Sequence, residues 1–164
     1  MNDRVRLTVE NGVADVRMIR VDKMNALDQA MFDALIATGK ALIDRTDVRA
    51  VVLSGEGRAF CAGLDMGRFQ NMAAGTDAGG ARPSHQQRLG PRTHGLSNAS
   101  QYAAMVWQDI PVPVIAAVHG VAFGGGLQVA LGADMRYVTP DVKMSVMEIK
   151  WGLVPDMAGV ALMR

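Results

Sequence analysis

Apolar and polar residues alternate at the start of the chain. Val5, Leu7 and Val9 are separated by polar residues, which is the two-residue period of a strand with one buried face. Asn11-Gly12 is a strong signal for a hairpin turn, so a second strand is expected over residues 13–19. The chain is therefore predicted to begin with two short strands joined by a tight turn.

Helical periods follow in two places. Beyond Asp28, apolar residues recur at spacings of three and four, as on one face of an amphipathic helix. They are Met31, Phe32, Leu35, Ile36, Leu42 and Ile43. Residues 97–109 show a second helical pattern, which Pro111 and Pro113 end.

Continuous apolar runs at 48–54 and 114–118 predict strands of a sheet that is covered on both faces. Shorter strands are expected at 135–138 and 142–146, and a glycine-rich loop opens a third helix near Gly126. Strands that alternate with helices at this spacing predict an α/β fold with parallel pairing.

Residues 67–96 stand apart, because they are rich in glycine and proline and have no apolar period. The strand pattern resumes after them, so they do not mark a domain boundary. We expect one domain over residues 1–164, with a flexible active-site insert at 67–96.

Composition narrows the class of protein. Hydrophobic residues make up 49% of the 164 residues and charged residues 20%, as in a globular protein. The formal net charge of +1 argues against partners such as nucleic acid or a membrane surface. The single cysteine favours a reducing, cytoplasmic location, and no signal peptide or membrane span is expected. Residues 159–164 read as the start of an apolar helix without a stop signal, which suggests the front portion of a longer protein.

One strand-loop pattern occurs twice, at 51–66 and 114–126. Each copy runs from an apolar strand into small residues just before a helix, where backbone N–H groups lack intrahelical partners. Two such loops side by side direct two donors at one oxygen, which is what an oxyanion hole requires.

Nucleotide binding is the main alternative for a glycine-rich loop. Gly124, Gly125 and Gly126 are followed by Leu127, Gln128 and Val129, so the last glycine of G-x-G-x-x-G is missing. Gly39-Lys40 lacks the upstream glycine and the following hydroxyl residue of a P-loop. Both nucleotide motifs are therefore disfavoured.

Four segments together resemble the crotonase family, also called the enoyl-CoA hydratase/isomerase family. They read NAL at 25–27, RAFCAGLDM at 58–66, HGVAFGGG at 119–126 and MEIKWGLVP at 147–155. The resemblance implies a crotonase-like spiral core of repeated strand-strand-helix units, the N-terminal catalytic portion of such an enzyme, without the family's C-terminal helical region. It also implies a homotrimer or hexamer for the full-length protein.

The resemblance implies an acyl-CoA thioester as substrate, with no bound cofactor and no metal. The thioester oxygen would lie between the backbone N–H groups of Leu64 and Gly125. The positions that correspond to contacts with CoA or substrate are Lys23, Met24, Ala26, Ala62, Gly63, Asp65, Met66 and Gly124.

The acid–base positions decide which family reaction is expected. Family hydratases use two glutamates, and the matching positions here hold Gln128 and Glu148. A carboxamide does not transfer protons near neutral pH, so an isomerase-like double-bond shift with Glu148 as proton shuttle is favoured. Asp156, eight residues further on, resembles a second proton-transfer group of the dienoyl-CoA isomerases.

Several alternatives stay open at this point. The family resemblance also allows an enoyl-CoA hydratase (a lyase), a hydrolase or a decarboxylase, and a non-catalytic acyl-CoA-binding scaffold is a further alternative. Glu148 is also explained as a cap of a strand end, and Asp156 as the N-cap of a helix. Cys61 is expected to be a packed thiol rather than a nucleophile, and the spacing of His85 and His94 does not suggest a metal site.

Overall fold

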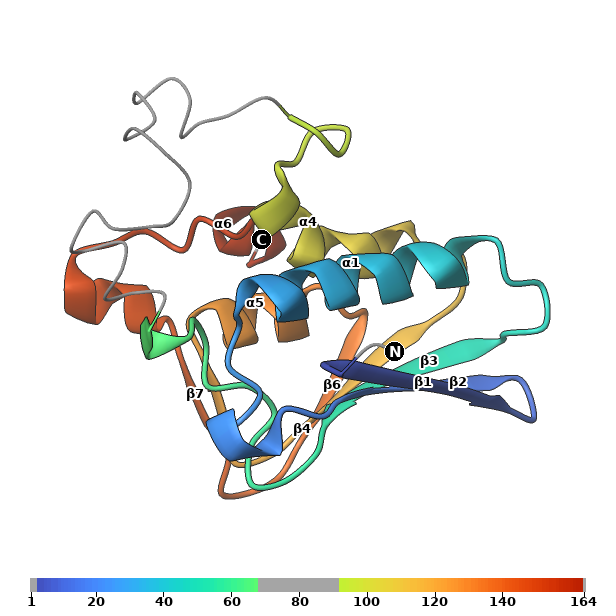
Figure 1. Ribbon diagram of the computed structural model, residues 1–164, viewed down its shortest axis with the longest axis horizontal. Helices are drawn as coiled ribbons and strands as arrows, with labels where there is room; N and C mark the ends of the chain where they lie inside the picture. The colour runs from blue at the N-terminus through green and yellow to red at the C-terminus, as the bar shows by residue number, and fades with distance from the viewer. Residues whose placement is uncertain (1–2, 68–91, 164) are drawn as a thin grey trace.

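The computed structural model of the chain describes residues 3–67 and 92–163. A five-stranded sheet in the order β1-β2-β3-β4-β6 lies below a layer of helices (Figure 1). The strands are β1 (Val5–Glu10), β2 (Val13–Met18), β3 (Ala50–Gly55), β4 (Val114–Val118), β5 (Val121–Phe123), β6 (Met135–Val138) and β7 (Lys143–Ser145). The helices are α1 (Gln29–Ile43), α4 (Ala99–Met105), α5 (Gly125–Leu131) and α6 (Gly159–Leu162), and the 3-10 turns are η1 (Val21–Lys23), η2 (Val106–Asp109) and η3 (Met147–Trp151).

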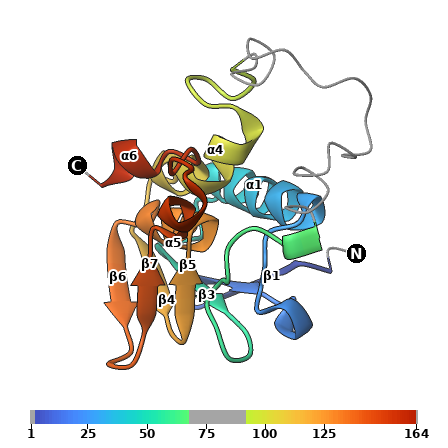
Figure 2. The same cartoon turned by 90° about the vertical axis from the view of Figure 1, so that its left-hand side faces the viewer.

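The pairing of the strands confirms the predicted α/β class. β1 and β2 form an antiparallel hairpin, whose turn places Asn11 and Gly12 at φ values of 52° and 80°. The pairs β2–β3, β3–β4 and β4–β6 are parallel. β5 and β7 pair in parallel as a second small sheet, seen below α5 in Figure 2. The order strand-strand-helix occurs as β1-β2-α1, β4-β5-α5 and β6-β7-α6, which is the expected crotonase-like repeat.

Side-chain caps explain where the two longer helices begin. The Asp28 carboxylate accepts a hydrogen bond from Met31 N, so Asp28 is the N-cap of α1, as its position in the sequence predicts. Asn98 and Gln101 form a reciprocal capping box at the start of α4. The second predicted helix, at 97–109, tightens into the 3-10 turn η2 after Met105.

The core lies between the sheet and the helices. Trp107, Phe60, Met18 and Leu35 are among its largest fully buried side chains. Every second residue of β4 is buried and the others are half-buried.

This alternation corrects one prediction from sequence: the apolar runs at 48–54 and 114–118 are not covered equally on both faces. Val51 and Leu53 face the helices and are buried, whereas Val52 and Ile115 are half-buried. Composition alone did not reveal this difference, because it depends on which elements pack against each face.

Some elements carry no clear signal in the sequence. The short strand β5 and the turns η1 and η3 are not among the elements predicted from hydrophobic period. Residues 68–91 of the predicted insert at 67–96 lie outside the described residues. Within the described parts of the chain, no helix is both long and apolar enough to span a membrane.

Candidate functional site

The two strand-loop segments lie side by side, as expected from their repeated pattern. Phe60 N donates to His119 O over 2.9 Å, and Cys61 N donates to Val121 O over 3.0 Å. Phe123 N donates back to Cys61 O over 3.1 Å. These bonds hold the loop after β3 against the loop after β4, directly before α5.

Two glycines allow the loops to approach closely. Gly63 has a φ of 91°, and a Cβ atom there would lie 2.6 Å from Phe123 O. Gly124 has a φ of 51°, and its Cβ position would lie 3.2 Å from Glu148 Oε1. A side chain at 63 would therefore separate the loops, and one at 124 would crowd the carboxylate.

The residues after these glycines supply the two predicted amide donors. Leu64 N and Gly125 N make no hydrogen bond with another described residue, whereas Gly124 N donates to Ser145 O. Leu64 and Gly125 both line a cavity of about 340 Å³. The cavity is lined by Phe32, Ala62, Gly63, Leu64, Met66, Ser100, Phe123, Gly124, Gly125, Met147, Glu148, Trp151, Leu153, Val154, Asp156 and Met157.

Glu148 presents one occupied and one unoccupied oxygen. Its Oε1 accepts a hydrogen bond from Gln128 Nε2 over 2.7 Å. Its Oε2 is buried and has no hydrogen-bond partner among the described residues. Buried polar atoms without partners are rare, because their desolvation is not offset by a hydrogen bond. Glu148 lies in η3 and bonds to a side chain, so the alternative that it caps a strand end is not what the structure shows.

The carboxamide of Gln128 has a defined orientation. Its Oε1 accepts a hydrogen bond from Gly159 N over 2.8 Å, and a backbone N–H can only donate. The Nε2 group must therefore be the end that faces Glu148. Gln128 is 2% exposed and lies behind Glu148 rather than on the cavity wall.

Asp156 lines the same cavity as Glu148 and is exposed to solvent. The N-cap of α6 is Ala158, so the alternative that Asp156 caps this helix is wrong. The cavity therefore contains two carboxylates of different exposure.

The eight positions expected to contact CoA or substrate fall into two groups. Ala62, Gly63, Met66 and Gly124 line the cavity. Lys23, Met24, Ala26 and Asp65 do not.

The second group has other surroundings. Lys23 is exposed, and Met24 O accepts a hydrogen bond from Ala62 N over 2.9 Å. Ala26 O accepts one from Arg20 Nη1 over 3.0 Å. The Asp65 carboxylate forms an ion pair with the same nitrogen of Arg20 over 2.8 Å.

Sequence reasoning did not single out Arg20, Asn25 or Ser100. The Asn25 side chain is fully buried and donates to Glu56 O over 3.0 Å and to Ala59 O over 2.9 Å, which ties two loops together. Its place in the motif at 25–27 was a signal for this role. Arg20 and Ser100 lie outside the motifs, so no pattern marks them.

Cys61 is confirmed as a packed thiol. It is fully buried, its Sγ donates to Asn25 O over 3.1 Å, and burial raises the pKa of the thiol to about 12. A thiol with this pKa is not a nucleophile near neutral pH. Among the described residues, no cluster of three or more His, Cys, Asp or Glu side chains could hold a metal ion.

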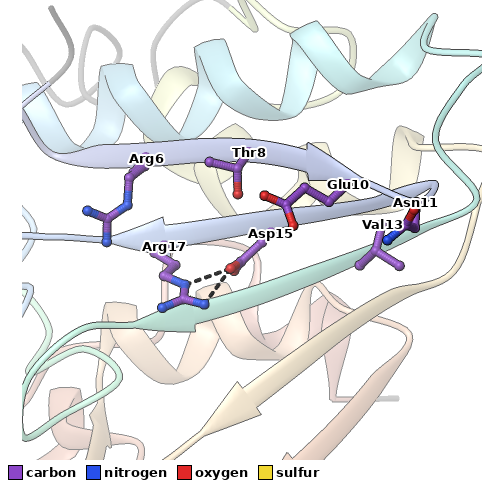
Figure 3. Close-up of a pocket in the computed structure, with 7 residues that line it drawn as sticks. All are labelled: Arg6, Thr8, Glu10, Asn11, Val13, Asp15 and Arg17. Atoms are coloured by element: carbon purple, nitrogen blue, oxygen red, sulfur yellow. Dashed lines mark hydrogen bonds and ion pairs between the residues drawn. The ribbon is translucent and has the colours of Figure 1, made fainter.

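A second hollow lies on the outer face of the β1–β2 hairpin (Figure 3). Its charged residues include Arg17, which donates to Asp15 over 2.7 Å, and Arg6, which pairs with Glu56. Paired charges on a strand face are typical of a solvated surface. The cavity at Glu148 is therefore the candidate functional site.

Comparisons with known proteins identify the family of the chain. The profile described as Enoyl-CoA hydratase/isomerase matches residues 8–164. A peroxisomal Delta(3,5)-Delta(2,4)-dienoyl-CoA isomerase of Arabidopsis thaliana is 27% identical over 153 residues, which is 93% of this chain and 54% of that protein.

Two crystal structures give the same result. Enoyl-CoA hydratase of Mycobacterium smegmatis superposes with a TM-score of 0.77 at 33% identity, covering 98% of this chain and 57% of that one. A protein of Thermobifida fusca solved in complex with acetoacetyl-CoA superposes with a TM-score of 0.76 at 29% identity, covering 99% and 61%. The chain thus spans little more than half the length of these relatives. With the fold, the paired loops and the profile match in agreement, the chain belongs to the enoyl-CoA hydratase/isomerase family.

Proposed function

We propose that this chain carries the catalytic centre of an acyl-CoA isomerase that stabilises a thioester enolate and moves a double bond along the acyl chain. The observation that carries the proposal is Glu148 Oε2, a buried oxygen without a partner among the described residues. It belongs to the same cavity as the free amides of Leu64 and Gly125. The proposal concerns the whole protein, because this chain covers only 54% of the relative from Arabidopsis thaliana.

The two amides would bind the thioester oxygen. Their hydrogen bonds would strengthen as negative charge develops on that oxygen, which lowers the barrier to removal of a proton from C2 of the acyl chain. Removing one donor is expected to cost on the order of 3 kcal/mol of transition-state stabilisation.

Glu148 Oε2 would transfer the proton. Starting from a 3-enoyl-CoA, it takes the C2 proton, and the electron pair of that bond forms a dienolate with its charge on the thioester oxygen. The protonated carboxyl then returns the proton to C4, the double bond moves from C3–C4 to C2–C3, and Glu148 is a carboxylate again. The substrate gains and loses one proton, so no co-reactant is needed.

Gln128 favours isomerisation over water addition. Addition of water by two carboxylates needs a second group that exchanges a proton, and a carboxamide does not do so near neutral pH. The Gln128 carboxamide is also already committed to Glu148 and to Gly159. Asp156 is the remaining carboxylate of the cavity, and we assign it the second proton transfer of a longer, conjugated substrate.

CoA is assigned to the loop that begins at Ala62. Ala62, Gly63 and Met66 line the cavity, and segment 24–27 supports them from behind. The apolar residues Trp151, Leu153 and Val154 line the same cavity as Glu148, which suits an acyl chain without charge.

The test is to incubate the full-length protein with a 3-enoyl-CoA, a 3,5-dienoyl-CoA and a trans-2-enoyl-CoA and to separate the products by mass and retention time. We expect a double-bond shift in the first two. Hydration of the third at a comparable rate would instead identify a hydratase, and no reaction in any arm would identify a binding scaffold.

Glu148→Gln is the matched variant. Gln at 148 keeps an oxygen for Gln128 to bind but removes the base, so the rate of isomerisation should fall about a thousandfold. Binding of the acyl-CoA, measured by calorimetry, should change little. Isomerisation at the parental rate in this variant would refute the role of Glu148.

A further inference from the structure

Arg20 lies two residues after the end of β2 and contacts the loop that carries Leu64 through Asp65. Its side chain is 15% exposed and reaches three acceptors through the same nitrogen, Nη1. It donates to Ala26 O over 3.0 Å and pairs with the Asp65 carboxylate over 2.8 Å. The Asp28 carboxylate lies further away, at 3.4 Å.

Backbone hydrogen bonds connect segment 24–27 to the residues on either side of Leu64. Leu27 N donates to Gly63 O over 2.8 Å, and Asp65 N donates to Leu27 O over 3.1 Å. Both neighbours of Leu64 are thus anchored to one residue of the facing segment. Arg20 then binds a carbonyl of that segment and the side chain of Asp65.

The charge of Asp65 matters for the chemistry of the site. Its side chain is 19% exposed and belongs to the residue after Leu64, whose amide donates to the thioester oxygen on which negative charge develops in the proposed reaction. An uncompensated carboxylate so close would oppose that charge, because partial burial weakens solvent screening. Its Oδ2 contacts Arg20 and its Oδ1 accepts from Gly67 N over 2.9 Å.

We propose that Arg20 is a positioning residue of the oxyanion site, which neutralises and fixes Asp65 so that the Leu64 amide can stabilise an enolate. This inference rests on the proposed function. It predicts that Arg20 matters for the rate only while residue 65 is charged.

Arg4 provides the matched control. Its Nη2 pairs with Asp28 Oδ2 over 2.9 Å, and its side chain is 22% exposed, close to the exposure of Arg20. Arg4→Gln therefore removes a similar ion pair from the same network without touching Asp65. It should lower stability and leave kcat within about twofold of the parent.

The experiment compares Arg20→Gln, Asp65→Asn and the double variant in the full-length enzyme. Arg20→Gln should lower kcat about thirtyfold with KM changed by less than about threefold, since the lost interaction acts on the transition state. In the Asp65→Asn background, the same Arg20 substitution should change kcat by less than about threefold.

The carbonyl carbon of bound trans-2-butenoyl-CoA, labelled with carbon-13, gives a second readout. Its chemical shift reports polarisation of the thioester and should move toward the value of the free ligand in Arg20→Gln but not in Arg4→Gln. Should Arg20→Gln fail to fold, the comparison of kcat between Asp65→Asn and the double variant still tests the inference.

A double variant much slower than Asp65→Asn, or a parental kcat in Arg20→Gln, would overturn the inference. The absence of any carbonyl shift in the parent enzyme would instead count against the proposed oxyanion site. The two failures are therefore distinguishable.

Discussion

Gln128 Nε2 lies 2.7 Å from Glu148 Oε1, and the donor and acceptor ends of this contact are fixed by a third group. Gly159 N–H binds Gln128 Oε1 over 2.8 Å, so the carboxamide cannot turn around without losing that bond. One carboxylate oxygen of Glu148 is consequently held, and the other has no hydrogen-bond partner among the described residues. In the proposed reaction, Gln128 would act through Glu148, as a positioning residue.

Gln128→Met tests this role. Methionine has a similar volume but no donor, so Glu148 Oε1 and Gly159 N–H both lose their partners. We expect the free energy of unfolding in urea to fall by about 1–3 kcal/mol. We also expect kcat to fall at least about tenfold, since Glu148 is no longer held. A kcat equal to that of the parent would show that Glu148 needs no such support.

Gln128→Glu tests why the reaction is isomerisation. A glutamate here places two carboxyl groups within hydrogen-bond distance, so they should share one proton and titrate as a pair. This adds a proton-exchanging group directly beside Glu148, and hydration of a trans-2-enoyl-CoA should rise about a hundredfold over the parent. The product is measured as the 3-hydroxyacyl-CoA by mass. Gln128→Met is the control that should show no gain in hydration. An unchanged hydration rate in Gln128→Glu would show that residue 128 does not determine which reaction occurs.

The candidate site could be predicted only in part from the sequence. The resemblance to the family predicted roles for Gln128, for Glu148 and for the amides of Leu64 and Gly125, whereas the repeated strand-loop pattern alone predicted only two adjacent loops with free amides. The contacts of Gln128 join residues 20 and 31 positions apart, and no local pattern encodes them. They arise from the packing of α5 against η3 and α6.

The fold shows the same limit. The class and the positions of most strands follow from hydrophobic period and turn signals, because these are local properties. The half-buried state of Val52 and Ile115 depends on what lies across the sheet, and β5 is recognisable only by its pairing with β7. Arg20 carried no signal either, because a lone arginine after a strand is usually solvated.

Gly63→Ala should disrupt the site by separating its loops. Its Cβ would lie 2.6 Å from Phe123 O, and its φ is 91°. Gly152→Ala is a matched control, since Gly152 has a φ of 64° and no atom within 4 Å of the Cβ position. The control should lose about 1 kcal/mol of unfolding free energy from backbone strain alone. Gly63→Ala should lose more and should show at least about tenfold lower kcat; equal losses in both variants would contradict the close approach.

The thiol of Cys61 reports on opening of the site. Because burial raises its pKa to about 12 and it is the single cysteine of the chain, reaction with a disulfide reagent should require unfolding. The rate of labelling should therefore rise with urea in parallel with the unfolded fraction. Rapid labelling of the native protein would disprove the packing of the loop around residue 61.

The Asp28 carboxylate should make the free energy of unfolding depend on pH in the acidic range. Burial alone would raise the pKa of its carboxyl, but hydrogen bonds from Arg4 and Met31 N and the charge of Arg20 outweigh it, and the folded-state pKa lies below the ordinary 3.8. Its contribution is present above the unfolded-state pKa and is lost as pH falls through the folded-state value. Asp28→Asn keeps a good N-cap and removes the charge, so it should cost on the order of 1 kcal/mol near neutral pH, and this cost should disappear as pH falls through the folded-state pKa. Urea unfolding of both proteins over this range measures it, and a constant difference would exclude the linkage.

The hydrogen bond from Gly159 to Gln128 gives the start of α6 influence over chemistry that it never contacts. A shift of that short helix would turn the carboxamide, and the carboxamide would carry the change to Glu148. In the proposed reaction, the position of α6 would therefore tune the proton-transfer oxygen through Gln128, without any change in the residues that line the cavity.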